Sequence, residues 1–258
     1  MTRSLLRSPW FPYRQSGSAA TVRLFCLPPA GGSASSYRAW RSGFPSDIEV
    51  IPVQLPGRES RLSEDPVTVA AELVELVADV VVATEGPPFA LFGHSMGAML
   101  AYELAAELTD RGTPPVHLVV SGGVPAHLDH LRPAPLDVAG MSDAHLCRYF
   151  AEYGGTDEDI LADTELMALL LPLLRADLTL CESHRWTPRA PLGMPITALG
   201  GAADPGVPAE LLARWSELTD ASFRMRTFPG GHHYLFDDVA AVIAAVSTTL
   251  LDSGGGAP

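Results

Sequence analysis

One segment, residues 89–109, constrains the fold of this chain more than any other. It contains a short apolar run at residues 89–92, the pentapeptide GHSMG at residues 93–97, and a pattern typical of a helix at residues 96–109. A G-x-S-x-G pattern between a strand and a helix indicates a turn so tight that residues flanking the serine must be small. Such a turn lifts the serine hydroxyl clear of the sheet, next to a helix N-terminus that favours negative charge. We therefore predict that Ser95 is a nucleophile.

Short apolar strands and helices alternate along most of the chain. The helix expected at residues 66–84 begins with Pro66 and carries an apolar stripe of Val69, Leu73, Leu76, Val77 and Val80. Alternation of this kind predicts an α/β fold with a mostly parallel central sheet flanked by helices, the pattern of an α/β-hydrolase when it contains such a serine turn. The other expected strands are residues 22–27, 48–53, 116–121, 195–199 and 223–228, and the other expected helices are 35–43, 208–218 and 237–251.

The alternation stops between about residues 131 and 185, where no strand is expected. Helices are expected there at residues 143–153, 158–162 and 164–183. An all-helical insertion between two strands of an α/β sheet usually forms a lid. We therefore expect one domain over residues 1–258, with a helical lid at about residues 131–185. Its apolar side chains either pack as ordinary core or also line a substrate passage, and the sequence leaves both interpretations open.

A nucleophilic serine needs a base and an acid that orients the base. In a fold of this kind the acid follows a late strand and the histidine follows the last strand. Asp204 follows the strand expected at residues 195–199, and His232 follows Pro229-Gly230-Gly231 after the last strand. His233 is the alternative base and is expected to pack or cap locally. Asp237 and Asp238 come after the histidines and are expected to cap a helix.

The developing oxyanion needs two hydrogen-bond donors, one of which is the backbone N–H of the residue after the nucleophile, here Met96. The other comes from the loop after an early strand. That loop begins with Pro28 and Pro29, which lack N–H groups, so Ala30 is the first residue that can donate. His94, next to the nucleophile, is expected to point away from the site.

Composition excludes several classes of function. The 258 residues carry a net charge of -13, which argues against general nucleic-acid binding. All 17 basic residues are arginines, so lysine Schiff bases, pyridoxal-phosphate lysines and P-loop lysines are excluded. The three cysteines lack metal-binding spacing, and the pair His127 and His130 lacks a partner motif. The sequence shows neither a signal peptide nor a membrane-spanning run, so we expect a cytoplasmic protein without cofactor or metal.

Several motifs together resemble the type II thioesterases of polyketide and nonribosomal peptide pathways, a branch of the α/β-hydrolases. The Gln54–Arg58 stretch and the Leu174–Asp177 stretch are more specific than the serine turn alone. The chain departs from the usual pattern at Pro29 and in the loop of residues 121–125, where relatives often carry other residues. The matching stretches are RLFCLPPAGGSAS (23–35), VIPVQLPGRE (50–59), LFGHSMGAMLAYELA (91–105), YGGT (153–156), LLPLLRADLTLCESHRW (170–186) and FPGGHHYL (228–235).

The resemblance implies a stand-alone editing enzyme that hydrolyses stalled acyl groups from the phosphopantetheine arm of an acyl or peptidyl carrier protein. It implies Ser95 as nucleophile, Asp204 as acid and His232 as base, with Ala30 and Met96 as oxyanion donors. No cofactor is implied, since the pantetheine belongs to the carrier, and neither nucleic acid nor a membrane is an expected partner. The alternatives are a product-releasing thioesterase, a general acyl esterase and a non-catalytic binding protein of the same fold.

Overall fold

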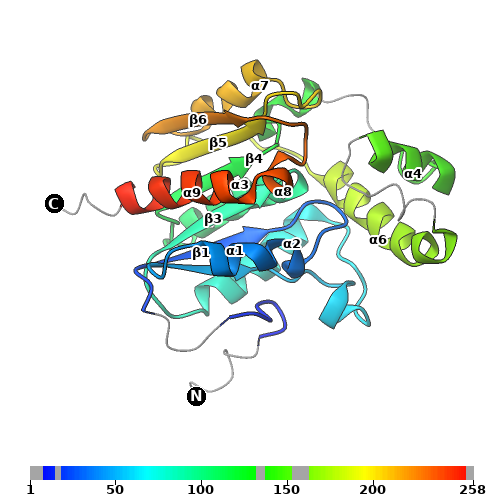
Figure 1. Ribbon diagram of the computed structural model, residues 1–258, viewed down its shortest axis with the longest axis horizontal. Helices are drawn as coiled ribbons and strands as arrows, with labels where there is room; N and C mark the ends of the chain where they lie inside the picture. Colours follow the sequence, from blue (N-terminus) through cyan, green and yellow to red (C-terminus); the bar gives the residue numbers. More distant parts are fainter. Residues whose placement is uncertain (1–7, 15–18, 132–136, 153–162, 254–258) are drawn as a thin grey trace.

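The computed structural model describes residues 8–14, 19–131, 137–152 and 163–253. Its centre is a sheet of six strands, all parallel, in the order β2-β1-β3-β4-β5-β6 (Figure 1). The predicted α/β fold is therefore confirmed, and the sheet is fully parallel within the described part of the chain. The strands are β1 (Val22–Leu27), β2 (Ile48–Pro52), β3 (Phe89–His94), β4 (His117–Ser121), β5 (Ile196–Gly201) and β6 (Phe223–Phe228).

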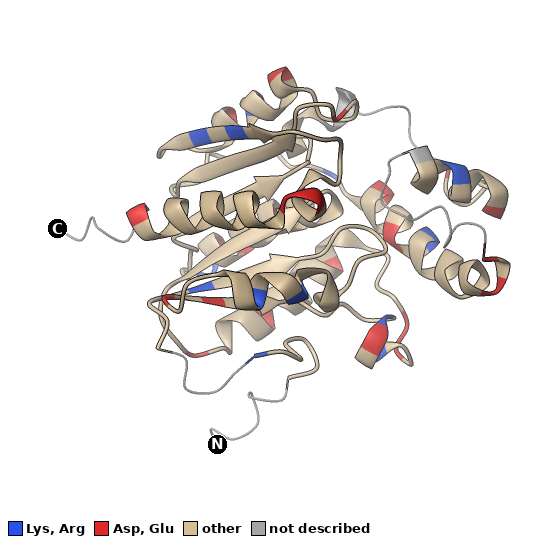
Figure 2. Cartoon of the chain, in the orientation of Figure 1, with Lys and Arg blue, Asp and Glu red and all other residues tan. Residues whose placement is uncertain are grey.

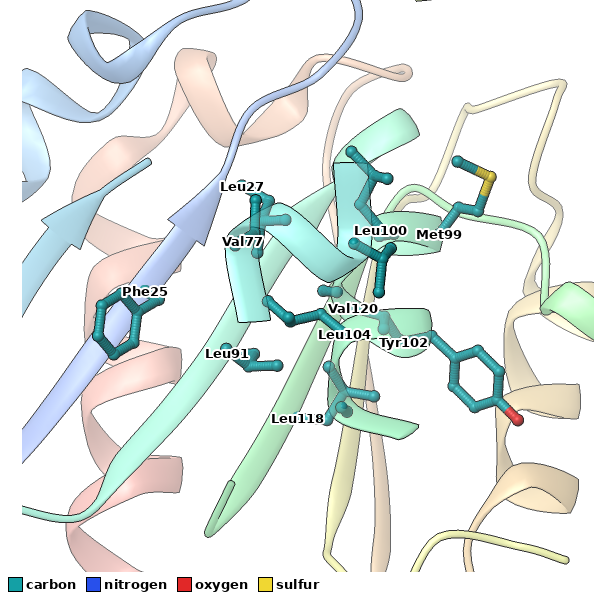
Figure 3. Close-up of a cluster of buried hydrophobic side chains, with 14 of the residues drawn as sticks. Phe25, Leu27, Val77, Leu91, Met99, Leu100, Tyr102, Leu104, Leu118 and Val120 are labelled. Carbon is teal, nitrogen blue, oxygen red and sulfur yellow. The ribbon is translucent and has the colours of Figure 1, made fainter. Parts of the chain in front are cut away.

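Both faces of the sheet are covered by helices, which explains why its central strands are apolar at nearly every position. Along β3, Leu91 faces one hydrophobic cluster, whereas its neighbours Ala90 and Phe92 face the other. Helices α2 (Ala70–Val82) and α3 (Met96–Asp110) pack side by side over the first cluster. Helices α1 (Arg38–Gly43) and α9 (Val239–Ser253) cover the second. Figure 3 shows part of the first cluster, with Leu91 and Leu104 among its side chains.

The helix expected at residues 66–84 is shorter at its start than the sequence predicts. It begins at Ala70, so Pro66 does not open it, and Val69 before it is extended, with φ −113° and ψ 117°. The Ser183 hydroxyl accepts a hydrogen bond from the Ala70 amide at 2.8 Å, so a residue from a distant helix caps the first turn.

The apolar stripe predicted for this helix is also partly wrong. Leu73 and Val77 are buried as expected, but Val69 is 47% exposed and Leu76 is 38% exposed. The buried face instead contains two adjacent columns of side chains, because α2 packs against α3 and its side chains join the first hydrophobic cluster. Its members are Ala70, Leu73, Val74, Val77, Ala78 and Val81.

The other helices agree with the sequence in position but are divided differently. The two short helices expected at residues 35–43 and 208–218 are each a pair of α and 3-10 turns. The last helix is interrupted at Asp238, whose carboxylate caps α9 by accepting from the Ala241 amide at 3.0 Å. Asp237 lies inside the preceding turn and caps no helix, contrary to expectation. The bounds are η2 (Ala34–Tyr37), η3 (Glu59–Arg61), η4 (Ala126–Leu131), α7 (Ala209–Ala213), η5 (Arg214–Leu218) and α8 (Tyr234–Asp237).

A helical insertion separates β4 from β5 and projects to one side of the sheet (Figure 1). It contains α4 (Asp143–Glu152) and α6 (Thr164–Ser183), which share a small hydrophobic cluster that includes Leu146, Phe150 and Leu174. Its role as a lid stays a prediction, and the helix expected at residues 158–162 lies outside the described residues. No helix in the described ranges is long and apolar enough to cross a lipid bilayer.

Candidate active site

Ser95 occupies a strained turn between β3 and α3. Its backbone has φ +56° and ψ −117°, a conformation that residues other than glycine rarely adopt. A Cβ atom on Gly93 would lie 1.8 Å from the Gly97 carbonyl oxygen, and one on Gly97 would lie 2.3 Å from the Leu27 oxygen. Both of these oxygens belong to the backbone and cannot move aside. Glycine is therefore required on steric grounds at positions 93 and 97 of the G-x-S-x-G motif. The Ser95 amide donates to the Ser121 carbonyl at 2.9 Å and ties the turn to β4.

The structure brings Ser95, His232 and Asp204 together in one hydrogen-bonded chain. The Ser95 Oγ lies 2.9 Å from His232 Nε2, and His232 Nδ1 lies 2.7 Å from Asp204 Oδ2. An ionised carboxylate only accepts hydrogen bonds, so Nδ1 donates to Asp204 and Nε2 faces the serine hydroxyl as an acceptor. This is the geometry that a serine nucleophile, its base and the orienting acid require.

Asp204 is held by the loop that follows β5. The Asp204 amide donates to the Gly201 carbonyl at 3.2 Å, and the Gly206 amide donates to the Asp204 carboxylate at 2.9 Å. Burial of the carboxyl group favours its neutral form, but the hydrogen bond and charge of His232, with the amides of Gly206 and Val207, outweigh burial. The pKa of Asp204 therefore lies below its ordinary value, and the group is ionised at neutral pH.

Two further histidines surround His232. The His94 ring centroid lies 5.0 Å from that of His232, so His94 packs against the candidate base and does not point away from the site as expected. The His233 ring lies 5.1 Å from His232 and stacks on Phe236 at 6.0 Å, in agreement with local packing. Burial, then the neighbouring imidazoles, lowers the pKa of His94 well below its usual value and that of His233 to about 4. Both are neutral at neutral pH, so neither adds a positive charge beside His232.

A buried hydrogen-bond chain behind the histidines involves two residues that sequence reasoning missed. His94 Nδ1 lies 2.9 Å from the Ser121 hydroxyl, which lies 2.6 Å from the Tyr234 hydroxyl. The Tyr234 ring stacks on Phe228 with centroids 5.2 Å apart. Tyr234 directly follows the two histidines, and Ser121 ends a predicted strand, so their positions in sequence were the available signal.

The expected oxyanion donors lie on two adjoining segments. Met96 begins α3 directly after Ser95. The loop that carries Ala30 begins beside the same turn, since the Leu27 and Pro28 carbonyl oxygens face Gly97. The Ala30 N–H donates to no acceptor in the hydrogen bonds of the described residues, which leaves it available to a substrate oxygen. Within the same residues, no group of three or more His, Cys, Asp or Glu side chains is arranged to hold a metal ion.

Comparison with known proteins identifies the family. The profile of the thioesterase domain matches residues 22–250. The gramicidin S biosynthesis protein GrsT of Aneurinibacillus migulanus is 41% identical over 229 residues, which cover 88% of each chain. Thioesterase PikA5 of Streptomyces venezuelae is 39% identical over 224 residues, or 84% of this chain and 77% of PikA5.

Solved structures agree in fold and in sequence. The RedJ thioesterase from the prodiginine pathway of Streptomyces coelicolor superposes with a TM-score of 0.82 at 40% identity, covering 94% of this chain and 98% of RedJ. The type II thioesterase BorB from the borrelidin biosynthetic cluster gives a TM-score of 0.81 at 37% identity, covering 91% and 94% of the two chains. The resemblance seen in the sequence motifs is confirmed, and the chain belongs to the thioesterase family of the α/β-hydrolase fold, as a type II thioesterase.

Proposed function

We propose that this thioesterase removes stalled acyl groups from the phosphopantetheine arm of carrier proteins, with Ser95, His232 and Asp204 as its catalytic residues. The observation that supports these roles is the continuous hydrogen-bond chain from the Ser95 hydroxyl through His232 to the Asp204 carboxylate. The choice of substrate is supported by relatives named for gramicidin S biosynthesis, for the borrelidin biosynthetic cluster and for the yersiniabactin NRPS/PKS pathway.

In the first half of the reaction Ser95 becomes acylated. His232 Nε2 takes the proton of the Ser95 hydroxyl as Oγ attacks the thioester carbonyl carbon, and Asp204 stabilises the imidazolium that forms. The Ala30 and Met96 amides donate to the carbonyl oxygen as it becomes negative. When the tetrahedral intermediate collapses, the carbon–sulfur bond breaks and the proton on His232 passes to the departing pantetheine thiolate.

In the second half water regenerates the enzyme. His232 accepts a proton from water as its oxygen attacks the acyl-Ser95 carbonyl carbon, and the same two amides hold the second oxyanion. The carbon–Oγ bond then breaks and Ser95 recovers its proton from His232. The products are a free carboxylic acid and a carrier protein whose thiol can be loaded again.

The partner in this proposal is an acyl or peptidyl carrier protein in the cytoplasm. Arginines on the helical insertion and directly after it are candidate contacts for the carrier, but Arg175, Arg185 and Arg189 are each engaged within the chain. Arg175 pairs with Asp143 at 2.7 Å and Arg189 with Glu103 at 2.8 Å, whereas Arg185 donates to the Glu182 carbonyl oxygen. The family and the complete triad geometry favour a hydrolase over a non-catalytic binding protein of the same fold.

Single-turnover hydrolysis of acetyl-, propionyl- and longer acyl-carrier proteins tests the proposal, with the matching acyl-N-acetylcysteamine thioesters and p-nitrophenyl esters as comparisons. We expect the carrier-bound thioesters to be cleaved fastest, and Ser95→Ala to lose activity by a factor of about 10⁴ or more. Ester cleavage that ignores the carrier would indicate a general acyl esterase. A cyclic or transferred product would indicate a releasing enzyme, and activity in Ser95→Ala would contradict the mechanism.

A further inference from the structure

Two family motifs that the catalytic triad does not use meet in the structure. The first lies after β2 and contains Arg58, and the second lies on α6 of the insertion and contains Asp177. Their side chains form a two-pronged ion pair, with Arg58 Nη2 to Asp177 Oδ1 at 2.7 Å and Nη1 to Oδ2 at 2.9 Å. The two side chains are only 5% and 1% exposed. Burial removes the hydration of both charges, and the cost can exceed their mutual attraction. A contribution to stability alone therefore does not explain why the pair is buried.

Both partners of this ion pair also bind the loop that carries the expected oxyanion donor. The Gly31 amide donates to Asp177 Oδ2 at 2.7 Å, and Arg58 Nη1 donates to the Gly32 carbonyl at 2.9 Å. These are the two residues directly after Ala30. The ion pair therefore links two segments of the fold and also hydrogen-bonds to the backbone of the loop.

The bonds fix a particular turn. The Gly32 amide donates to the Pro29 carbonyl at 2.9 Å, and Gly31 has φ +73°, which together describe a type II turn with Ala30 and Gly31 at its centre. In a type II turn the central peptide, here the one between Ala30 and Gly31, is flipped relative to a type I turn. The hydrogen bond from the Gly31 N–H to Asp177 holds this flipped peptide and so helps to select the turn type. A Cβ atom on Gly31 would lie 2.5 Å from the Leu174 side chain, so α6 also packs directly on the turn.

The arginine is itself held in place from the other side. Gln54 is fully buried, its Nε2 donates to the Arg58 carbonyl at 3.1 Å, and its Oε1 accepts from the Ala34 amide at 3.2 Å. Gln54 thus joins the loop after β2 to the loop after β1. Helix α6 is joined to the same two loops through Asp177.

We propose that Arg58 and Asp177 are positioning residues that set the Ala30 amide for oxyanion stabilisation, so that docking of α6 and formation of the oxyanion site are coupled. The proposal rests on the catalytic roles assigned above to Ser95 and Ala30. It also assigns a reason to the two motifs: one supplies the cation and the other supplies the anion that together hold one turn.

Binding of a trifluoromethyl ketone with the alkyl chain of the best substrate measures oxyanion stabilisation directly. Ser95 Oγ adds to its carbonyl carbon, the serine proton passes to His232, and the ketone oxygen becomes the oxyanion. The same chain ending in a methyl amide binds without this addition. For Asp177→Asn we expect the inhibition constant of the ketone to rise about 10- to 100-fold in step with a fall in kcat. The inhibition constant of the amide and the KM for an acyl-N-acetylcysteamine should change less than about 2-fold.

Arg175→Gln is the matched control. Arg175 lies two residues before Asp177 on the same helix, but it pairs with Asp143 and donates to the Val138 carbonyl within the insertion. Its loss should leave the ratio of ketone to amide affinity unchanged. An equal change in both ligands for Asp177→Asn, or no change in either, would overturn the proposal.

A double variant guards against loss of folding in Asp177→Asn, which leaves Arg58 with a weakened partner. Arg58→Met with Asp177→Leu replaces the buried pair by apolar side chains, a change that proteins often tolerate, and still removes the acceptor of the Gly31 amide. We expect a folded protein with the same selective loss of ketone affinity, whereas full ketone affinity would overturn the proposal. Failure of the wild type to form the adduct would instead contradict the catalytic role of Ser95.

Discussion

At the scale of single residues, His117 shows how one buried side chain ties stability to pH. It begins β4 and is 3% exposed, and its Nε2 lies 2.9 Å from the Thr197 hydroxyl. Burial, and after it the charge of Arg224, lowers the pKa of His117 from 6.5 to about 4. The unfolded chain therefore binds a proton between these two values that the folded chain does not bind.

Because the unfolded state holds the extra proton, the stabilisation linked to His117 is complete above its unfolded pKa and decreases as pH falls toward about 4. His117→Gln keeps a hydrogen-bonding side chain but does not titrate. Between about pH 7 and about pH 5 we expect the free energy of unfolding of the wild type to fall by about 2 kcal/mol more than that of the variant. Urea unfolding at each pH measures this difference, and His145→Gln, at an exposed histidine, is the control. Parallel pH profiles would show that His117 is not held neutral.

The residues of the candidate site divide into those that sequence could find and those that it could not. Ser95, Asp204 and His232 were predicted because each follows a strand, and the ends of parallel strands meet at one edge of a sheet. The pairing of Arg58 with Asp177 joins residues 119 positions apart, and no local pattern connects them. Their motifs were recognised as specific, but only the tertiary structure shows that both act on one turn.

At the scale of elements, the strands were predicted almost to the residue, whereas helix α2 was not. Strand positions are fixed by short apolar runs between turn residues, which are local signals. The start of α2 depends on the cap from Ser183, and its buried face depends on packing against α3 within the first hydrophobic cluster. These contacts come from distant parts of the chain and override the stripe expected from periodicity alone.

Two leucines on α2 test this description, since they differ in burial but not in type. Leu73 is 2% exposed and Leu76 is 38% exposed, although both belonged to the predicted stripe. We expect Leu73→Ala to lower the free energy of unfolding by about 2–5 kcal/mol, because it removes buried methyl groups and leaves a cavity. Leu76→Ala should cost less than about 1 kcal/mol. Denaturant unfolding of both variants measures the two losses in free energy of unfolding. Equal losses would show that Leu76 is buried as fully as Leu73, as the stripe inferred from sequence requires.

At the scale of the whole molecule, the net charge of -13 bears on how the enzyme meets its proposed partner. Figure 2 shows acidic and basic residues dispersed over the elements, and the helices of the insertion carry both signs. A carrier protein of net negative charge would thus be repelled at long range, and productive contact would have to be local and largely apolar. Leu169 on α6, which is 76% exposed, is one apolar side chain available for it.

The salt dependence of kcat/KM separates these contributions. Between about 0.02 M and about 0.5 M salt the Debye length shrinks several-fold, so long-range repulsion is screened while apolar contact is retained. We therefore expect kcat/KM for an acidic acyl-carrier protein to stay level or rise with salt, and that for a neutral acyl-N-acetylcysteamine to stay constant. A fall for the carrier substrate alone would mean that arginines attract it across short distances. Charge reversal at Arg148, which is exposed on α4, would then be the first variant to locate the contact.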